Sequence, residues 1–244
     1  MRIQLSEEEV ADYRANGFLV VEELLTAPEL AQWRDAVDTV IAQDLVKPPT
    51  DSAAGKARVF DQRMNLRRAS AAMKPLVQDR SIGKLIAQLE GVDAVRVYLD
   101  QALVKEPYGA PTQFHQDLPW WPFDSNNAAT IWIALDDATV QNGCLYFVPG
   151  SHHLDVTYKS DLGSQLGAIF DANPQITRAP VPGAIPAGGM HVSQRPDDPW
   201  GRRQHDGGPP AGDDGGVHAG RRTVQRHPGR QGSRCGIPRH PRRW

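Results

Sequence analysis

The sequence has few of the features that mark several classes of protein. Its 244 residues include only two cysteines, Cys144 and Cys235, which form neither a CxxC metal pair nor a disulfide framework. No apolar run approaches the roughly 18 residues needed to cross a bilayer, and the first residues contain no apolar stretch of the secretory type. We therefore expect a cytoplasmic protein without a membrane partner.

Net charge is also small, at a formal value of -2, so nothing in the overall balance favours nucleic acid as a partner. The balance is uneven along the chain. Residues 190–244 contain 11 Arg and 5 Asp but no Lys, Glu, Leu or Phe, a charge of +6 that leaves -8 for residues 1–189. Because this Gly-, Pro- and Arg-rich segment cannot bury much apolar surface, we predict a folded domain over residues 1–189 and a disordered tail over 190–244.

Two capping boxes predict helices in the first part of the chain. The strings "SEEE" from residue 6 and "TAPE" from residue 26 each place a hydroxyl at an N-cap and a carboxylate three residues later. The first helix is expected to end at Gly17, and the second to run over residues 28–43 with one apolar face. The string "FLVVEEL" between them predicts a short strand or buried connector, and "SIGKLIAQLEG" predicts a third helix that ends at Gly91.

The pattern then changes to one typical of strands. The strings "AVRVYLDQALVKEP", "TIWIALDDA" and "GCLYFVPGS" are rich in β-branched and aromatic residues and are separated by turn residues. Helices followed by a run of antiparallel strands indicate an α+β chain whose β part is a sandwich or barrel of the jelly-roll type. The Pro-, Ser- and Gly-rich residues 45–58 are expected to form a loop.

The string "FHQDLPWW" contains the first candidate for chemistry. At the end of a strand, His115 and Asp117 would point to the same side, because alternate residues of a strand share a face. An imidazole and a carboxylate suit Fe(II), and one further histidine would complete the facial triad of non-haem iron oxygenases. An H-x-D pair is common, however, so its surroundings must decide its meaning.

The surrounding string, "FHQDLPWWPFDSNNAATIWIALDDATVQNGCLYFVPGSHH", resembles the phytanoyl-CoA dioxygenase family of Fe(II)- and 2-oxoglutarate-dependent oxygenases. The H-Q-D, W-I-A-L-D-D, N-G-C-L and P-G-S-H motifs match in order and spacing, and the resemblance extends over roughly residues 5–189. It implies a cupin-like double-stranded β-helix with N-terminal packing helices, in which His115 and Asp117 bind iron. It also implies that Gln101 and Trp132, and more weakly Lys105, contact the cosubstrate 2-oxoglutarate.

Several of these residues have simpler interpretations. Gln101 could be an outward-facing strand residue, and Trp132 could be an ordinary core residue. Trp120 and Trp121 either line a substrate pocket or cover the edge of the sheet. The pair at positions 136 and 137 looks like a catalytic acid pair, but adjacent strand residues face opposite ways, which favours a structural role in satisfying turn amides.

The third iron ligand is missing from the expected place. In the family, a second histidine follows on a late strand in a pattern like H-G-x-G-x-N-x-[ST], and an arginine about eleven residues later pairs with the distal carboxylate of 2-oxoglutarate. No such string follows Asp117. His152 and His153 belong to the P-G-S-H motif, which is a different element, and the remaining histidines, at positions 191, 205, 218, 227 and 240, lie in the unusual tail.

A shift of reading frame accounts for both the missing ligand and the change of composition. Reading one base later from the Met190 codon gives cysteine at position 190 and threonine or methionine at 191, and it permits histidine at 199 and arginine at 210. The separation between these last two matches the family pattern. In the chain as it stands those positions are Pro199 and Pro210, which bind neither a metal nor a carboxylate. An uninterrupted single frame in the coding DNA around codon 189 would contradict this hypothesis.

Three functions are therefore considered. The first is a dioxygenase that uses Fe(II), 2-oxoglutarate and O₂ to hydroxylate a small organic substrate at a C–H bond, with this chain impaired by the loss of its late strands. The second is a non-catalytic jelly-roll protein that binds a small molecule and keeps a vestigial metal site. The third is polyanion binding by the basic tail, which its aspartates and lack of lysine disfavour. Nothing in the sequence selects the substrate or the oligomeric state.

Overall fold

The structure is a computed structural model that describes residues 1, 4–43, 61–105, 111–117, 127–154, 156, 166–194, 218–219 and 222–226. Its elements are α1 (Glu7–Asn16), β1 (Phe18–Val21), α2 (Ala27–Ala42), β2 (Asp61–Met64), α3 (Leu66–Ala69), α4 (Met73–Val77), α5 (Arg80–Glu90), β3 (Arg96–Val97), β4 (Asp100–Val104), β5 (Ala129–Ala134), β6 (Leu145–Phe147), the 3₁₀ turn η2 (Ser151–His153), α6 (Ala168–Ala172), β7 (Val181–Gly183), β8 (Met190–Gln194), β9 (His218–Ala219) and β10 (Arg222–Arg226). The loop predicted over residues 45–58 lies outside the described residues.

The predicted helices form where their capping signals indicate. In α1 the Glu9 amide donates to Ser6 Oγ at 3.1 Å, and the Ser6 amide donates to Glu9 Oε2 at 2.8 Å. These reciprocal bonds satisfy two amides that have no partner inside the helix. The helix predicted over residues 28–43 is α2, and the one predicted to end at Gly91 is α5. None of the helices in the described ranges is long and apolar enough to cross a membrane.

A six-stranded sheet forms the centre of the molecule, with the strand order β1-β8-β5-β10-β4-β2. The β1–β8, β8–β5 and β4–β2 pairs are antiparallel, as the sequence predicts, but β10 is parallel to both β4 and β5. Since β4 and β5 therefore point the same way, any strand between them must be parallel to both or antiparallel to both. Residues 222–226 adopt the parallel arrangement, which corrects the expectation of a purely antiparallel set.

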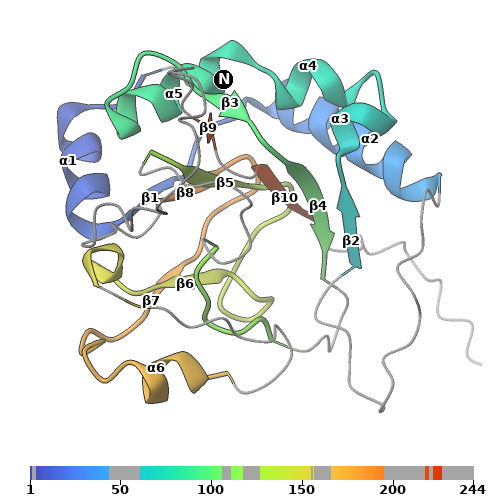
Figure 1. Ribbon diagram of the computed structural model, residues 1–244. Helices are drawn as coiled ribbons and strands as arrows, with labels where there is room; N and C mark the ends of the chain where they lie inside the picture. The colour runs from blue at the N-terminus through green and yellow to red at the C-terminus, as the bar shows by residue number, and fades with distance from the viewer. Residues whose placement is uncertain are drawn as a thin grey trace, which may run out of the picture.

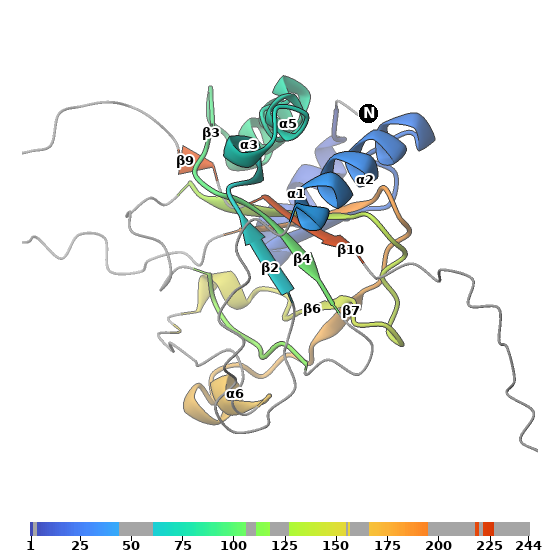
Figure 2. The same cartoon turned by 90° about the vertical axis from the view of Figure 1, so that its right-hand side faces the viewer.

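The two faces of this sheet are covered differently (Figure 1). Helices α1 to α5 lie over one face, while β6, β7 and α6 lie beyond the other, and the view turned by 90° shows the same layers (Figure 2). The larger apolar cluster fills the space beneath the helices and includes Trp33, Ile86, Ile131, Ile133 and Val192. A smaller cluster on the opposite face contains Trp132, Ala134, Ala138, Cys144 and Ile185. We call this second side the interior face.

Strand β8 corrects the prediction that the late strands are missing or disordered after about residue 189. Residues 190–194 pair with β1 on one side and with β5 on the other, and Met190, His191 and Val192 are buried. The alternation of apolar and polar residues in "MHVSQ" suits a strand covered on one face by the helical core. Order thus extends past the change in composition, while the division into a domain and a tail stays a prediction.

The C-terminal end of α1 is a junction of three chain segments. The Gly150 amide donates to Asn16 O, the Gln194 amide donates to Gly17 O, and the His152 ring contacts Arg14 O through Nε2 at 3.0 Å. Gly17 has φ +80°, and a Cβ there would lie 2.3 Å from Nδ1 of His152. A side chain at position 17 would therefore both strain the backbone and collide with the imidazole.

Candidate metal centre

His115 and Asp117 lie close together, although they do not lie on a strand. Residues 111–117 form an irregular segment without helix or strand, so strand alternation is not what brings the two side chains together. Nε2 of His115 lies 3.5 Å from Oδ1 of Asp117, and both side chains are partly exposed. The predicted proximity is present, and local hydrogen bonds hold each residue in place.

One of these bonds sets the orientation of the imidazole. Nδ1 of His115 lies 2.7 Å from the carbonyl oxygen of Gln113. Because a carbonyl can only accept, Nδ1 must carry the proton, and in the neutral ring Nε2 then presents its lone pair to the side where Asp117 lies. A backbone carbonyl in this position is a common way for proteins to fix a histidine that binds a metal.

Asp117 is held by a residue of the central sheet. The hydroxyl of Thr130, on β5, donates to Oδ2 of Asp117 at 2.5 Å, which leaves Oδ1 facing His115. The ring of Phe114 packs edge-on against Phe170 of α6 with 4.9 Å between the centroids. These two contacts attach the irregular segment to the interior face and to α6. Thr130 lies two residues before Trp132 in the "TIWIA" strand, so strand alternation could have identified it.

The donor set fits a divalent first-row ion. Metal bonds from imidazole nitrogen and carboxylate oxygen are about 2.1 Å long, so two ligands of one ion are separated by at most about 4.2 Å. The 3.5 Å separation of the two donor atoms is within this limit. His115 and Asp117 are therefore suitable ligands, and the nitrogen–oxygen pair is of the type that non-haem iron uses.

A third ligand is not found in the parts of the chain that the structure describes, which contain no group of three His, Cys, Asp or Glu side chains able to hold a metal. His152 and His153 lie at the end of α1, where Nε2 of His152 contacts Arg14 O. Only the backbone of His218 is described, within β9. His205, His227 and His240 lie outside the described residues.

Gln101 and Trp132 face the interior side of the sheet, as the resemblance implies for cosubstrate contacts. Both residues pair with the same residue of β10, which places them on one line across the strands. Gln101 is buried, and its Oε1 accepts from Nε2 of Gln62 on β2 at 2.5 Å. The interpretation of Gln101 as an outward-facing residue is therefore wrong. Its role, like that of Trp132, stays a prediction.

Lys105 follows β4 and lies near the N-G-C turn. A Cβ at Gly143 would be 3.2 Å from Cδ of Lys105, and burial lowers the pKa of the lysine. An amine in such surroundings attracts a carboxylate more strongly than an exposed one does, because little water screens it. Trp120 and Trp121, the candidates for a substrate pocket, lie outside the described residues.

The acid pair at positions 136 and 137 has the structural role predicted for it. Oδ1 of Asp137 accepts from the Ala187 amide at 2.9 Å, and Asp136 lies 3.6 Å from the guanidinium of Arg34. The first contact ties the turn after β5 to the approach to β8. The two carboxylates point to different partners, so they do not form a catalytic pair.

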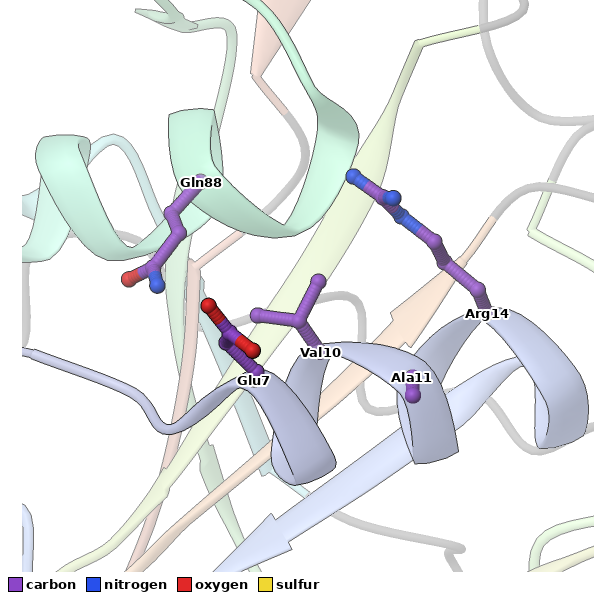
Figure 3. Close-up of a pocket in the computed structure, with 5 residues that line it drawn as sticks. All are labelled: Glu7, Val10, Ala11, Arg14 and Gln88. Atoms are coloured by element: carbon purple, nitrogen blue, oxygen red, sulfur yellow. The ribbon is translucent and has the colours of Figure 1, made fainter.

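Two cavities in the described part of the chain lie away from the metal pair. One, of about 350 Å³, is a groove between α1 and α5 lined by Glu7, Val10, Ala11, Arg14 and Gln88 (Figure 3). The other, of about 220 Å³, lies against η2 and the segment before β7. Neither includes a candidate site residue. On the interior face beside Trp132, the space is occupied by the ring of His191, a residue that the sequence pattern did not mark as part of the site.

Comparison with known proteins agrees with this arrangement. A probable alpha-ketoglutarate-dependent hypophosphite dioxygenase from Stutzerimonas stutzeri is 26% identical over 152 residues, which cover 59% of this chain and 53% of that protein. This chain therefore spans about half the length of that relative. The carbocyclase SnoK and the epimerase SnoN of nogalamycin biosynthesis are each 25% identical, with TM-scores of 0.66 and 0.62; the matches cover 79% and 78% of this chain and 76% and 74% of those proteins.

The family model for phytanoyl-CoA dioxygenase matches residues 13–188, a range that contains every residue predicted above for the metal pair and the cosubstrate site. That match covers well over half of the sequence. The solved structure of SnoN contains Fe³⁺ and alpha-ketoglutarate, and SnoK is described as alpha-ketoglutarate-dependent. On these grounds the chain belongs to the phytanoyl-CoA dioxygenase family.

Proposed function

We propose that this protein is built for the chemistry of an Fe(II)- and 2-oxoglutarate-dependent dioxygenase that hydroxylates a small organic substrate at a C–H bond. The observation that carries the proposal is the His115–Asp117 pair, with its donor atoms 3.5 Å apart and each side chain fixed by a second hydrogen bond. Family membership supports the same chemistry. When bound, iron would activate O₂, which is the oxidant, and 2-oxoglutarate would supply two electrons as it is decarboxylated.

The protein's own residues have simple tasks in this function. Gln113 keeps the proton of His115 on Nδ1, so that Nε2 can bind the metal. Thr130 holds Oδ2 of Asp117, and Oδ1 lies on the side of His115, where the ion would bind. The interior face carries Gln101 and Trp132, which would contact 2-oxoglutarate, and the apolar cluster around Trp132 would keep water from the reacting atoms.

Metal binding tests the proposal directly. Calorimetric titration of the full chain with Mn²⁺ or anaerobic Fe²⁺ should show one site, and His115→Ala and Asp117→Ala should each abolish it. His153→Ala is the matched control, since it removes an exposed histidine of the turn η2. Unchanged metal affinity in both site variants would contradict the proposal.

A second function is favoured by one observation. Only two suitable ligands come together in the described residues, which is the arrangement expected of a jelly-roll binding protein with a vestigial metal site. Iron-dependent decarboxylation of 2-oxoglutarate distinguishes the two functions. We expect none from the present chain and measurable turnover from a chain whose reading frame is restored after codon 189. Inactivity of the restored chain, with its metal bound, would favour the binding protein.

The substrate is not fixed by the relatives. Their names include a hypophosphite dioxygenase, a methylphosphonate hydroxylase and a carbocyclase, which differ in the bond that reacts. We therefore propose a small-molecule substrate without naming its class. A screen for substrate-stimulated 2-oxoglutarate consumption by the restored chain would identify it.

A further inference from the structure

His191 lies on the same face of the sheet as the candidate metal pair. It pairs with Trp132 of β5 and with Val20 of β1, so the three residues form one line across neighbouring strands. Thr130, which holds Asp117, lies two residues before Trp132 and therefore faces the same side. The imidazole of His191 thus lies on the sheet face to which Thr130 attaches Asp117, and among the described residues it forms no three-ligand group with His115 and Asp117.

Aromatic rings enclose the imidazole. It stacks on the Trp132 indole with 5.1 Å between centroids and 28° between planes, and Phe147 of β6 meets it edge-on at 5.2 Å. Phe147 in turn stacks on Phe18 of β1 at 4.5 Å. At Gly183 on β7, a Cβ would lie 2.8 Å from Nε2 of His191. Packing on several sides therefore keeps the ring against Trp132.

The ring has good packing but poor hydrogen bonding. His191 is 1% exposed, and neither ring nitrogen has a hydrogen-bond partner in the described part of the chain. Burial lowers the pKa of His191 to about 4. The nearby Gly183 backbone acts in the opposite direction but offsets only part of this effect. Burying polar atoms without partners is unfavourable, so packing and not hydrogen bonding holds the imidazole here.

A dicarboxylate bound at the metal would need the same space. If 2-oxoglutarate bound at the His115–Asp117 pair, one end of the molecule would lie beside Asp117 and Thr130. Its five-carbon chain is about as long as two residues of a strand, roughly 6–7 Å. Two residues from Thr130 along β5, on the same face, lies Trp132, and the stacked imidazole of His191 covers its indole.

We propose, building on the function proposed above, that His191 occupies part of the cosubstrate site and blocks 2-oxoglutarate in this chain. A shorter side chain at position 191 uncovers the Trp132 indole and opens a pocket for the distal part of the dicarboxylate. The reading-frame hypothesis is compatible with this proposal, because one of the two residues that the shifted codon can encode at this position is threonine, which is shorter than histidine and carries no ring.

Two substitutions at position 191 test the proposal, one that removes the ring and one that keeps it. His191→Thr removes the ring and keeps a β-branched residue suited to a strand, whereas His191→Phe keeps the ring and removes only the nitrogens. Calorimetric titration of the Mn²⁺-loaded full chain with 2-oxoglutarate should show affinity raised about tenfold or more in His191→Thr and unchanged in His191→Phe. A tenfold gain in affinity would mean that the ring of His191 is out of the site in no more than about a tenth of the molecules of the unsubstituted chain.

Three results would overturn the proposal. The first is equal 2-oxoglutarate affinity in the original chain and both variants, and the second is a tighter complex with His191→Phe. The third is weaker Mn²⁺ binding in His191→Thr, because it would make His191 a ligand and not an obstruction. If His191→Thr does not fold, His191→Val, which has the same shape as threonine, takes its place with the same expectation.

An inert probe can detect the opened pocket independently of 2-oxoglutarate binding. Xenon binds engineered apolar cavities regardless of the metal, so its uptake by His191→Thr but not by His191→Phe reports the opened space and supports the proposal. Xenon uptake without any gain in 2-oxoglutarate affinity contradicts the assignment of that space to the cosubstrate. The function proposed above fails separately, when Mn²⁺ binding does not depend on His115.

Discussion

The two faces of the central sheet differ in the side chains that they bury and in the hydrogen bonds that these side chains make. Beneath the helices, Ile131, Ile133 and Val192 are apolar and almost fully buried. On the interior face, the neighbouring residues Thr130, Trp132 and His191 are polar or aromatic, and His191 has no hydrogen-bond partner in the described chain. Alternate residues of the same strands therefore have different roles. The apolar face stabilises the fold, and the interior face carries the residues proposed for the metal and cosubstrate site.

The largest expected effect concerns the helix-covered face. Ile133→Ala should lower the free energy of unfolding by about 2–5 kcal/mol, because Ile133 is fully buried and its loss leaves a cavity that the neighbours cannot fill. Urea unfolding followed by circular dichroism measures the change. Thr130→Ala, on the other face, is the control and should cost much less. Equal losses would show that the two faces do not differ in their contribution to stability.

The second effect is a dependence of stability on pH that comes from the interior face. The pKa of His191 is about 4 in the folded state and about 6.5 in the unfolded chain, so the unfolded state binds more protons between these values. The free energy of unfolding should fall as the pH drops from about 6.5 to about 4, by up to about 3 kcal/mol in total. Above pH 7 this contribution is constant.

His191→Phe provides the comparison, since it keeps the ring packing and cannot take up a proton. Chemical unfolding at several pH values from 4 to 8 should show a steeper loss for the original chain than for this variant. Parallel curves would mean that His191 does not remain neutral in the folded protein.

The third effect concerns the metal ligands. Thr130→Val keeps the shape of the side chain and removes the hydroxyl that orients Asp117. Mn²⁺ affinity should fall about 10- to 100-fold, as it does when partners of metal ligands are lost. Thr130→Ser keeps the hydroxyl and should retain most of the affinity. If both variants bind Mn²⁺ like the original chain, then Asp117 does not depend on this bond.

The smallest effect is expected at Gln62. Gln62→Met removes the amide that donates to Oε1 of Gln101 while it keeps the length of the side chain. The free energy of unfolding should fall by about 1 kcal/mol, the usual net contribution of one hydrogen bond. Urea unfolding measures it, with Gln78→Met on the exposed end of α4 as the control. If Gln62→Met lowered the free energy of unfolding as much as Ile133→Ala does, the two faces of the sheet would contribute equally to stability.

Local signals in the sequence predicted the elements that local physics determines. The capping residues fixed the start of α1, the left-handed glycines ended α1 and α5, and alternation located β4, β5 and β6. The H-x-D motif correctly predicted that His115 and Asp117 lie close together, while their role as metal ligands stays a prediction. In each case the determining residues lie within a few positions of the element they define.

Contacts between distant segments could not be obtained in this way. Nothing near Gln101 indicates that Gln62 will be its partner, and nothing near His191 indicates that Phe147 and Trp132 will enclose its ring. The strand formed by residues 190–194 was missed because the composition of the whole tail concealed five residues with a regular alternation. Such features depend on tertiary packing, which overrides the composition of the surrounding sequence.

The pairing of β1 with β8 also sets the order of events during synthesis. Among the strands that the structure describes, β1 lies at the edge of the six-stranded sheet and pairs there with β8, with Phe18 opposite Ser193. Because β1 precedes β8 in the chain, it leaves the ribosome earlier and must wait for residues 190–194 before it can form this pair. Until then its apolar side chains stay accessible to chaperones and to other nascent chains. A change in the sequence of residues 190–194 would therefore leave β1, far earlier in the chain, without its partner in the sheet.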